Sequence, residues 1–196
     1  MTRGPSLSDG RWLNEPADWR GTADGIALVA EEGSDFWRET HYGFVHDSGH
    51  FLGLETAPAF TAQVRVRAAL AELYDQAGLM VRASERHWLK GGVEISDGIA
   101  QIGSVLTEDR SDWACAPFSG DPSDFTLRLS LKDGVLRLQV RDAAGDFRLL
   151  RLCPFAAKGP VLVGPMACAP KRSGLAVAFS DFVLGPAEDK DLHDLS

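Results

Sequence analysis

The sequence has few cysteines, no long apolar run and no excess of basic residues. Its three cysteines, Cys115, Cys153 and Cys168, are an odd number, and none stands at a metal-type spacing from another. No apolar run approaches the roughly 18 residues of a bilayer span. The 20 basic residues are outnumbered by 28 acidic ones, for a net charge of −8. Because nucleic acids and anionic lipids need basic surfaces, we expect neither nucleic acid nor membrane as a partner.

The first residues also lack an apolar signal core. Together with the unpaired cysteines, this absence predicts reduced thiols and a cytoplasmic protein. The 196 residues are 44% hydrophobic and 24% charged, which is ordinary for a globular chain. A chain of this length buries a core without disulfides or metal. No linker divides the sequence, so we expect one domain over 1–196, with a core at about 12–186 and a loosely packed acidic tail at 187–196.

The motifs of several enzyme classes are missing. No two glycines stand two residues apart, which excludes the dinucleotide-binding fingerprint and the kinase glycine loop. There is no phosphate-binding P-loop, no G-x-S-x-G nucleophile elbow, no H-E-x-x-H and no EF-hand loop. Glu-x-Asp is also absent, although many jelly-roll glycosidases carry their paired carboxylates in such a pattern. We therefore expect no cofactor.

What the sequence does contain is alternation of apolar and polar residues. Segments 125–131 and 136–140 alternate on either side of Asp133-Gly134, and Asp-Gly between such runs is a strong hairpin signal. A third strand at 147–152 completes a meander. Further strands are expected at 60–68, 79–82, 93–95, 99–106 and 175–184, with Asp97-Gly98 as a second hairpin turn.

Helical periodicity is weak, and residues 68–74 offer at most one short helix. About ten short strands, frequent turns and little helix predict an all-β protein, either a β-sandwich or a jelly roll.

Three of the five histidines, His41, His46 and His50, lie within ten residues. Such a cluster is compatible with a divalent metal site or an acid–base centre. The alternative is a hairpin with strand 40–45, a turn at 47–49 and a strand from His50. His41 and His50 would then face one another with hydrogen bonds to the backbone. We favour the hairpin and expect no metal.

A second group of polar residues lies on one face of two neighbouring expected strands, because every second side chain of a strand points to the same face. Gln76 and Arg82 share one face of the first strand, and Trp88, Lys90 and Glu94 share one face of the second. A Lys–Glu pair can transfer protons or clamp a polyhydroxylated ligand, and an exposed Trp is a stacking platform. The alternative is a cross-strand salt bridge on a solvated face, which contributes little.

Ser-Asp followed by an aromatic residue occurs four times, starting at Ser34, Ser111, Ser123 and Ser180. The intervals are uneven, which argues against a repeat architecture. Ser and Asp side chains cap turns, and the aromatic residue then begins a strand. Trp113, the aromatic residue of the second copy, either lines the same cleft as Lys90 or belongs to the core, and the core is favoured for an isolated tryptophan.

Five segments between about Trp12 and Pro186 carry a likeness to a known family. They are Phe36–Phe44 (FWRETHYGF), Tyr74–Met80 (YDQAGLM), Trp88–Glu94 (WLKGGVE), Ser111–Trp113 (SDW) and Gly164–Pro170 (GPMACAP). Together they resemble the regulation-of-enolase-like family of uncharacterised bacterial and fungal proteins. The resemblance implies a concanavalin A-like jelly roll of two antiparallel sheets, with no established catalytic activity. The fungal namesake is connected to control of a glycolytic enzyme. The family motifs fall on His41, Tyr42, Asp75, Gln76, Trp88, Lys90, Glu94, Asp112, Trp113 and Cys168.

Our first hypothesis is a protein that binds a small polar ligand, such as a carbohydrate, on a concave sheet face. Its expected binding residues are Gln76, Arg82, Trp88, Lys90, Glu94, His41, Tyr42 and Trp113. A carbohydrate-active hydrolase, lyase or isomerase is the second, with Glu94 as acid or base and Lys90 or His41 assisting. Asp75 supplies a second carboxylate only if a bulge turns it inward. Cys168 has no His or Asp partner nearby, so we expect a buried, inert thiol.

The third hypothesis is a noncatalytic regulator that binds another protein. Four acidic residues of the tail, Glu188, Asp189, Asp191 and Asp194, would support such a contact, although a charged tail is usually only solvated.

Overall fold

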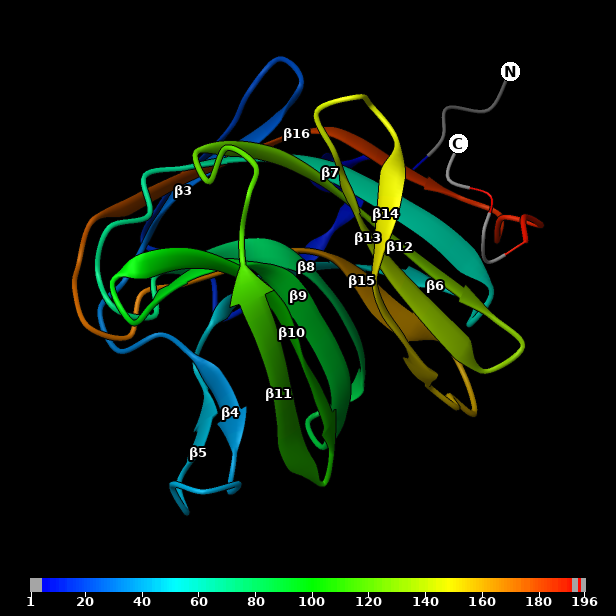
Figure 1. The fold of residues 1–196 in the computed structure, drawn as a ribbon, viewed down its shortest axis with the longest axis horizontal. Helices are drawn as coiled ribbons and strands as arrows, with labels where there is room; N and C mark the ends of the chain where they lie inside the picture. The colour runs from blue at the N-terminus through cyan, green and yellow to red at the C-terminus, as the bar shows by residue number, and fades with distance from the viewer. Residues whose placement is uncertain (1–4, 192–193, 195–196) are drawn as a thin grey trace.

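The computed structural model describes residues 5–191 and 194, and its regular secondary structure is almost entirely β-strand (Figure 1). Within these residues the one helical element is a short 3₁₀ helix, η1 (Leu7–Asp9). The all-β prediction is therefore confirmed, and the candidate helix at 68–74 is the end of a strand followed by a loop. No helix in this part of the chain has the length and apolar character needed to cross a membrane.

Two seven-stranded antiparallel sheets form the sandwich. In spatial order, sheet A contains β1 (Arg11–Leu13), β6 (His50–Thr56), β15 (Val161–Cys168), β8 (Gln76–Ser84), β9 (His87–Ser96), β10 (Ile99–Glu108) and β11 (Arg110–Pro117). Sheet B contains β14 (Phe147–Pro154), β13 (Val135–Arg141), β12 (Asp124–Lys132), β7 (Phe60–Ala68), β16 (Leu175–Gly185), β3 (Gly25–Ala30) and β2 (Asp18–Gly21). A separate hairpin pairs β4 (Phe36–Arg38) with β5 (Val45–Asp47).

The two Asp-Gly turns lie where the alternation places them. Asp97-Gly98 joins β9 to β10, and Asp133-Gly134 joins β12 to β13. All four residues have positive φ, between 51° and 77°, which is the backbone of a type I′ hairpin turn. The predicted meander is confirmed as neighbouring strands β12, β13 and β14 of sheet B.

The alternating apolar residues form the core between the two sheets. Leu79 and Val81 on β8 and Leu89 on β9 are fully buried there, as are Leu127 and Leu129 on β12. The intervening side chains of β8 and β9 point to the outer face of sheet A, the face turned away from sheet B. This period-2 division is the one read from the sequence.

Part of the outer face of sheet A is also buried. Seven residues form a second apolar cluster there: Phe36, Phe51, Met80, Trp88, Val105, Met166 and Cys168. The segment that carries β4 and β5 crosses this face, and the Phe36 ring lies 6.0 Å from that of Trp88. The prediction of an exposed Trp88 platform is therefore wrong. Trp88 is on the predicted face but is 0% exposed, because a segment remote in sequence covers it.

The predicted hairpin between residues 40–45 and His50 is also wrong. The paired strands are β4 and β5, with Trp37 opposite His46, and His41 lies in the turn that joins them. His50 begins β6 in sheet A, so His41 and His50 do not face one another.

The described part of the acidic tail lies on the outer face of sheet B. The Glu188 carboxylate pairs with Arg128 at 3.1 Å and with Arg137 at 3.3 Å. The backbone N–H of Glu188 donates to Thr61 Oγ1 at 2.9 Å, and Arg137 donates to the carbonyl of Asp191 at 3.2 Å. This segment is packed against the sheet rather than loose. Residues 192–193 and 195–196 lie outside the described residues.

Replacing the shared carboxylate of the tail tests this packing. We expect Glu188→Gln to lower the free energy of unfolding by about 2 kcal/mol, because Arg128 and Arg137 are largely buried and lose an anionic partner. The matched control is Asp189→Asn, which removes an exposed partner of Lys132 and should cost less than about 1 kcal/mol. Urea unfolding measures both values. Equal effects would contradict an anchoring role for Glu188.

Candidate functional site

A pocket of about 340 Å³ opens on the outer face of sheet A, between the β4–β5 hairpin and strands β8 to β11. Four polar side chains line its interior: Asp35, Gln76, Lys90 and Glu94. Six rings surround them: Trp37, Tyr42, Phe44, His46, Tyr74 and Trp113. Rings around a few convergent polar groups are typical of small-molecule sites.

The floor of the site is a row of glycines across three strands. Gly92 on β9 pairs with Gly78 on β8 and with Gly103 on β10, and directly paired residues share one face of an antiparallel sheet. With no side chains in this row, a narrow cleft of about 20 Å³ remains beside Lys90 and Glu94, about the space of one water molecule. The backbone is also tightly packed, because a Cβ on Gly92 would lie 2.1 Å from the Ala77 carbonyl oxygen.

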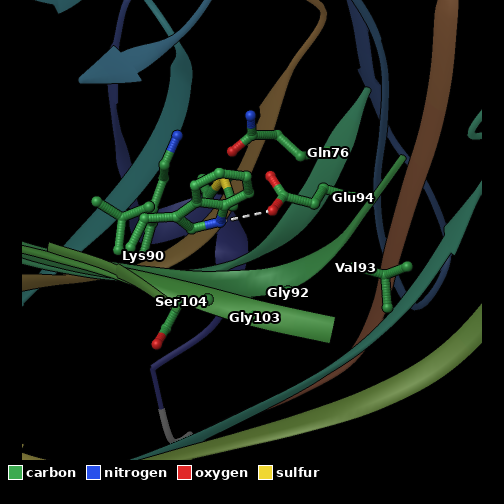
Figure 2. A pocket seen from close by; sticks show the side chains of 11 residues that line it. Gln76, Lys90, Gly92, Val93, Glu94, Gly103 and Ser104 are labelled. Atoms are coloured by element: carbon green, nitrogen blue, oxygen red, sulfur yellow. Dashed lines mark hydrogen bonds between the residues drawn. The ribbon is translucent and has the colours of Figure 1, made fainter. Parts of the chain in front are cut away.

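The polar residues stand in the rows that flank these glycines. Gln76 pairs with Glu94 on one side of the glycine row, and Lys90 lies on the other side. In Figure 2, Gln76, Lys90 and Glu94 point to one side of the sheet, whereas Val93 and Ser104 point to the other. Period-2 alternation is thus what gathers these three side chains.

A buried ammonium–carboxylate pair organises the pocket. Lys90 Nζ donates to Asp35 Oδ1 at 3.0 Å, and the two side chains are 5% and 20% exposed. Gln76 Nε2 donates to the same oxygen at 3.5 Å. Burial by itself lowers the pKa of Lys90, but the carboxylates of Asp35 and Glu94 reverse this effect, so its pKa is raised. Lys90 is therefore a fixed cation.

Glu94 is the carboxyl group of the pocket whose pKa is raised. Burial raises its pKa, and the charge of Lys90 together with a hydrogen bond from Trp113 only partly opposes that rise. Trp113 Nε1–H donates to Glu94 Oε1 at 2.8 Å. Asp35 adds to the rise by charge repulsion. A carboxyl group with a raised pKa in a cleft is suited to proton transfer or to hydrogen bonding with a ligand.

The rings of the pocket contact one another. Tyr42 and Phe44 stack at 5.2 Å with an angle of 11° between their planes, and Trp37 packs edge-on against Tyr42. The Tyr42 hydroxyl, hydrogen-bonded to that of Tyr74, raises the pKa of Tyr74 to about 12. Tyr74 has φ of +65°, a conformation that bulky residues rarely adopt outside strained or functional positions.

Five of the predicted binding residues line the pocket: Gln76, Tyr42, Lys90, Glu94 and Trp113. The favoured placement of Trp113 in the core is wrong, because Trp113 is 38% exposed and lines the cleft. The remaining three do not line it. Arg82 donates to both carboxylate oxygens of Asp47, at 2.7 and 2.8 Å. Trp88 is covered by Phe36, and His41 is exposed in the β4–β5 turn.

The second carboxylate of the pocket is Asp35, and sequence reasoning missed it. Asp75 is fully buried elsewhere and pairs with Arg172 at 2.7 Å. The sequence pattern Ser34-Asp35-Phe36 predicts a turn cap, and Asp35 Oδ1 does accept the N–H of Phe36 at 2.7 Å. The signal that could have found Asp35 is the motif itself, since it precedes the family segment at Phe36.

The remaining nominated residues have structural surroundings. His50 Nδ1 bonds to the Asn14 carbonyl at 2.7 Å, and its Nε2 accepts the N–H of Glu31 at 3.1 Å. Cys168 is fully buried, and burial raises the pKa of its thiol, in agreement with the expected inert cysteine. In the part of the chain that the structure describes, no three His, Cys, Asp or Glu side chains form a metal-type cluster.

Removing the indole donor to Glu94 tests the electrostatics of the pocket. We expect Trp113→Phe to raise the pKa of Glu94 further, because the lost hydrogen bond favours the ionised form. An acid whose pKa is raised on folding lowers the free energy of unfolding at pH values above its folded pKa. This loss of stability disappears at pH values below its ordinary pKa of 4.5, where the acid is protonated in both states. Relative to the wild type, Trp113→Phe should therefore lose more free energy of unfolding at neutral pH than at about pH 4. Carboxyl-carbon NMR and urea unfolding measure the two quantities.

Trp19→Phe is the matched control for this prediction. Trp19 is 39% exposed, close to the 38% of Trp113, and it donates to Glu15 Oε1 at 2.7 Å. It lies on β2 of sheet B, away from the pocket. Trp19→Phe should leave the pKa of Glu94 unchanged. An unchanged pKa of Glu94 in Trp113→Phe would contradict a hydrogen bond that stabilises the ionised carboxylate.

Fold and site define the class: a jelly-roll β-sandwich with a charged, ring-walled pocket on the outer face of one sheet. Residues 12–187 match the family described as "Protein of unknown function (DUF1349)", and the chain belongs to that family. Over 195 residues it is 52% identical to "Regulation of enolase protein 1" of Saccharomyces cerevisiae (strain ATCC 204508 / S288c), across 100% of this chain and 98% of that protein. The family resemblance read from the five segments is thereby confirmed.

Solved structures agree with this assignment. A crystal structure of a functionally unknown protein from Saccharomyces cerevisiae is 52% identical, with a TM-score of 0.92 over 94% of this chain and 100% of that one. Carbohydrate binding module CBM66 from Bacillus subtilis is 10% identical, with a TM-score of 0.53 over 89% of this chain and 94% of that one. The second likeness shows the shared jelly-roll fold.

Proposed function

We propose that this protein binds a carbohydrate or a similar polar metabolite in the pocket of sheet A. The observation that carries the proposal is one set of polar side chains, with Gln76 and Lys90 buried and Asp35 and Glu94 half-buried, among exposed and half-buried rings. Charged and amide groups hydrogen-bond the hydroxyls of such a ligand, and Trp113 and Tyr42, 38% and 51% exposed, offer faces for its C–H groups. The fold shared with a carbohydrate binding module adds support by analogy.

A second candidate is a carbohydrate-active enzyme that uses Glu94 as acid or base. Two observations favour it. Burial raises the pKa of Glu94, which brings a carboxyl group toward the range useful for proton transfer. A second carboxylate, Asp35, lines the same pocket. Such an enzyme would release a product from the bound sugar, whereas a binding protein returns it unchanged.

A third candidate follows from the yeast relative, which is named for regulation of enolase. A noncatalytic regulator would bind a metabolic enzyme, with or without a ligand in the pocket. Capture of purified enolase by this protein, measured with and without a bound sugar, tests that role directly.

A thermal-shift screen with mono- and oligosaccharides tests the primary proposal. A ligand at 100 times its Kd adds about 2.7 kcal/mol of stability, a shift of roughly 5–10 °C for a domain of this size. We expect Glu94→Gln to reduce the shift, because Glu94 lines the pocket, and Glu15→Gln to keep it, because Glu15 lies outside the lining. The two variants are matched, since each glutamate accepts an indole N–H. Chromatography of the incubated sugar identifies turnover. A flat panel, or equal shifts in both variants, would overturn the proposal.

A further inference from the structure

We propose that the pocket selects uncharged sugars and polyols and rejects the corresponding sugar acids and sugar phosphates. The inference rests on the proposed function and narrows it to one class of ligand. It follows from the hydrogen-bonding groups that the pocket presents and from the sign of its buried charge.

Three acceptor oxygens of the pocket have no partner among residues 5–191 and 194. In Asp35, Oδ1 accepts hydrogen bonds from Lys90 and from the N–H of Phe36, which leaves Oδ2. In Glu94, Oε1 accepts from Trp113, which leaves Oε2. Gln76 Nε2 donates to Asp35 and to the Tyr74 carbonyl at 3.2 Å. These two acceptors fix the orientation of the Gln76 amide, so its Oε1 is the third free acceptor.

Among Asp35, Gln76, Lys90 and Glu94, the free donors are the two remaining N–H groups of Lys90, beside three free acceptor oxygens. Lys90 spends one of its three N–H groups on Asp35. The indole N–H groups of Trp37 and Trp113 are committed to the Thr40 carbonyl and to Glu94. Arg82, which lies on the same sheet face, is committed to Asp47 and does not line the pocket.

The charges inside the pocket also disfavour an anionic ligand. Asp35 and Glu94 bring two carboxylates to the interior, against the single ammonium of Lys90. Lys171 also lines the pocket, but it is exposed to solvent, which screens its charge more than that of the buried Lys90. An additional carboxylate or phosphate placed beside Glu94 would meet repulsion inside a partly desolvated cleft.

A sugar hydroxyl suits this arrangement because it donates and accepts at once. It can donate to Glu94 Oε2 or Asp35 Oδ2 while it accepts from Lys90. A carboxylate or phosphate dianion only accepts, so it would leave those carboxylate oxygens without partners, and an unpaired buried polar group is costly. Proteins that bind phosphates or carboxylates typically present bidentate arginines or free backbone N–H groups instead.

Isothermal titration calorimetry with matched ligand sets tests the inference on the full chain. The sets are glucose, glucuronate and glucose 6-phosphate, and galactose, galacturonate and galactose 6-phosphate, with glycerol and sorbitol as simple polyols. We expect a neutral member to bind and its acid and phosphate to bind at least tenfold more weakly, a gap of about 1.4 kcal/mol. An acid or phosphate that binds as tightly as its neutral parent would overturn the inference and leave the proposed function intact.

The variant Glu94→Gln tests the cause of the selectivity. It removes one negative charge and supplies an amide donor, so the gap between glucuronate and glucose should shrink severalfold. Asp35→Asn serves the same purpose if the first variant is unfolded by circular dichroism. Glu15→Gln lies outside the pocket and should keep the gap of the wild type. An unchanged gap in folded Glu94→Gln and Asp35→Asn would contradict the mechanism, and no binding by any ligand would overturn the proposed function as well.

Discussion

Lys90→Met is expected to lower the free energy of unfolding by about 3 kcal/mol and to abolish the response to sugar. The Lys90 side chain is 5% exposed, and its ammonium is bonded to Asp35 at 3.0 Å. Its removal leaves the two carboxylates of Asp35 and Glu94 in the lining of the same pocket without this cation. Since Lys90 also opposes the burial that raises the pKa of Glu94, that pKa should rise further in the variant. The loss of stability is then greatest at neutral pH and smaller at about pH 4.

Lys132→Met is the matched control, because it also removes a lysine that pairs with an aspartate. Lys132 and Asp189 are 46% and 93% exposed, and an exposed pair of this kind contributes less than about 1 kcal/mol. Urea unfolding at the two pH values gives the comparison. Similar losses in both variants, or a Lys90→Met protein that still responds to sugar, would contradict the organising role of Lys90.

Gly92→Ala should cost at least about 3 kcal/mol of stability or prevent folding altogether. An added Cβ would lie 2.1 Å from the carbonyl oxygen of Ala77 and 2.9 Å from the Cα of Gly78. Both neighbours belong to the backbone of β8, so no side chain can move aside. The strands must separate, and the hydrogen bonds between β8 and β9 would be strained at the floor of the pocket.

Gly21→Ala is the control, since Gly21 is also a strand glycine but nothing lies within 4 Å of its added Cβ. Glycine in a strand carries an entropic penalty, so this variant should be neutral or slightly stabilising, within about 1 kcal/mol. The midpoints of thermal and urea unfolding measure both proteins. Comparable stability of the two variants would show that the backbone of β8 and β9 is not held as described.

Much of the fold could be predicted because the informative signals are local. Alternation in 125–131 and 136–140 and the Asp-Gly turns specify hairpins whose partners adjoin in sequence. Several of the strands that escaped prediction lack such signals. β11 is an edge strand whose residues are almost all exposed, and β1 has three residues. β4 is held partly by remote contacts, such as the bond from the N–H of Arg38 to Ser111 Oγ at 2.9 Å.

The site was predictable only as far as strand periodicity reaches. Counting by twos placed Gln76, Lys90 and Glu94 on one face, because adjacent paired strands keep their alternation. The same count could not show that Phe36 covers Trp88. It also could not supply Asp35, which lies 55 residues from Lys90 in sequence and reaches it only when its segment crosses the sheet.

The five tryptophans allow the most direct test of the proposed binding site. Their indole N–H groups give five signals in a ¹⁵N–¹H NMR spectrum, assignable by Trp→Phe substitution. Trp37 and Trp113 line the pocket, whereas Trp12, Trp19 and Trp88 do not. Titration with a sugar identified by the thermal-shift screen should move the signals of Trp37 and Trp113 and leave those of Trp12 and Trp19 in place. Movement confined to Trp12 and Trp19, or no movement at all, would contradict ligand binding at Lys90 and Glu94.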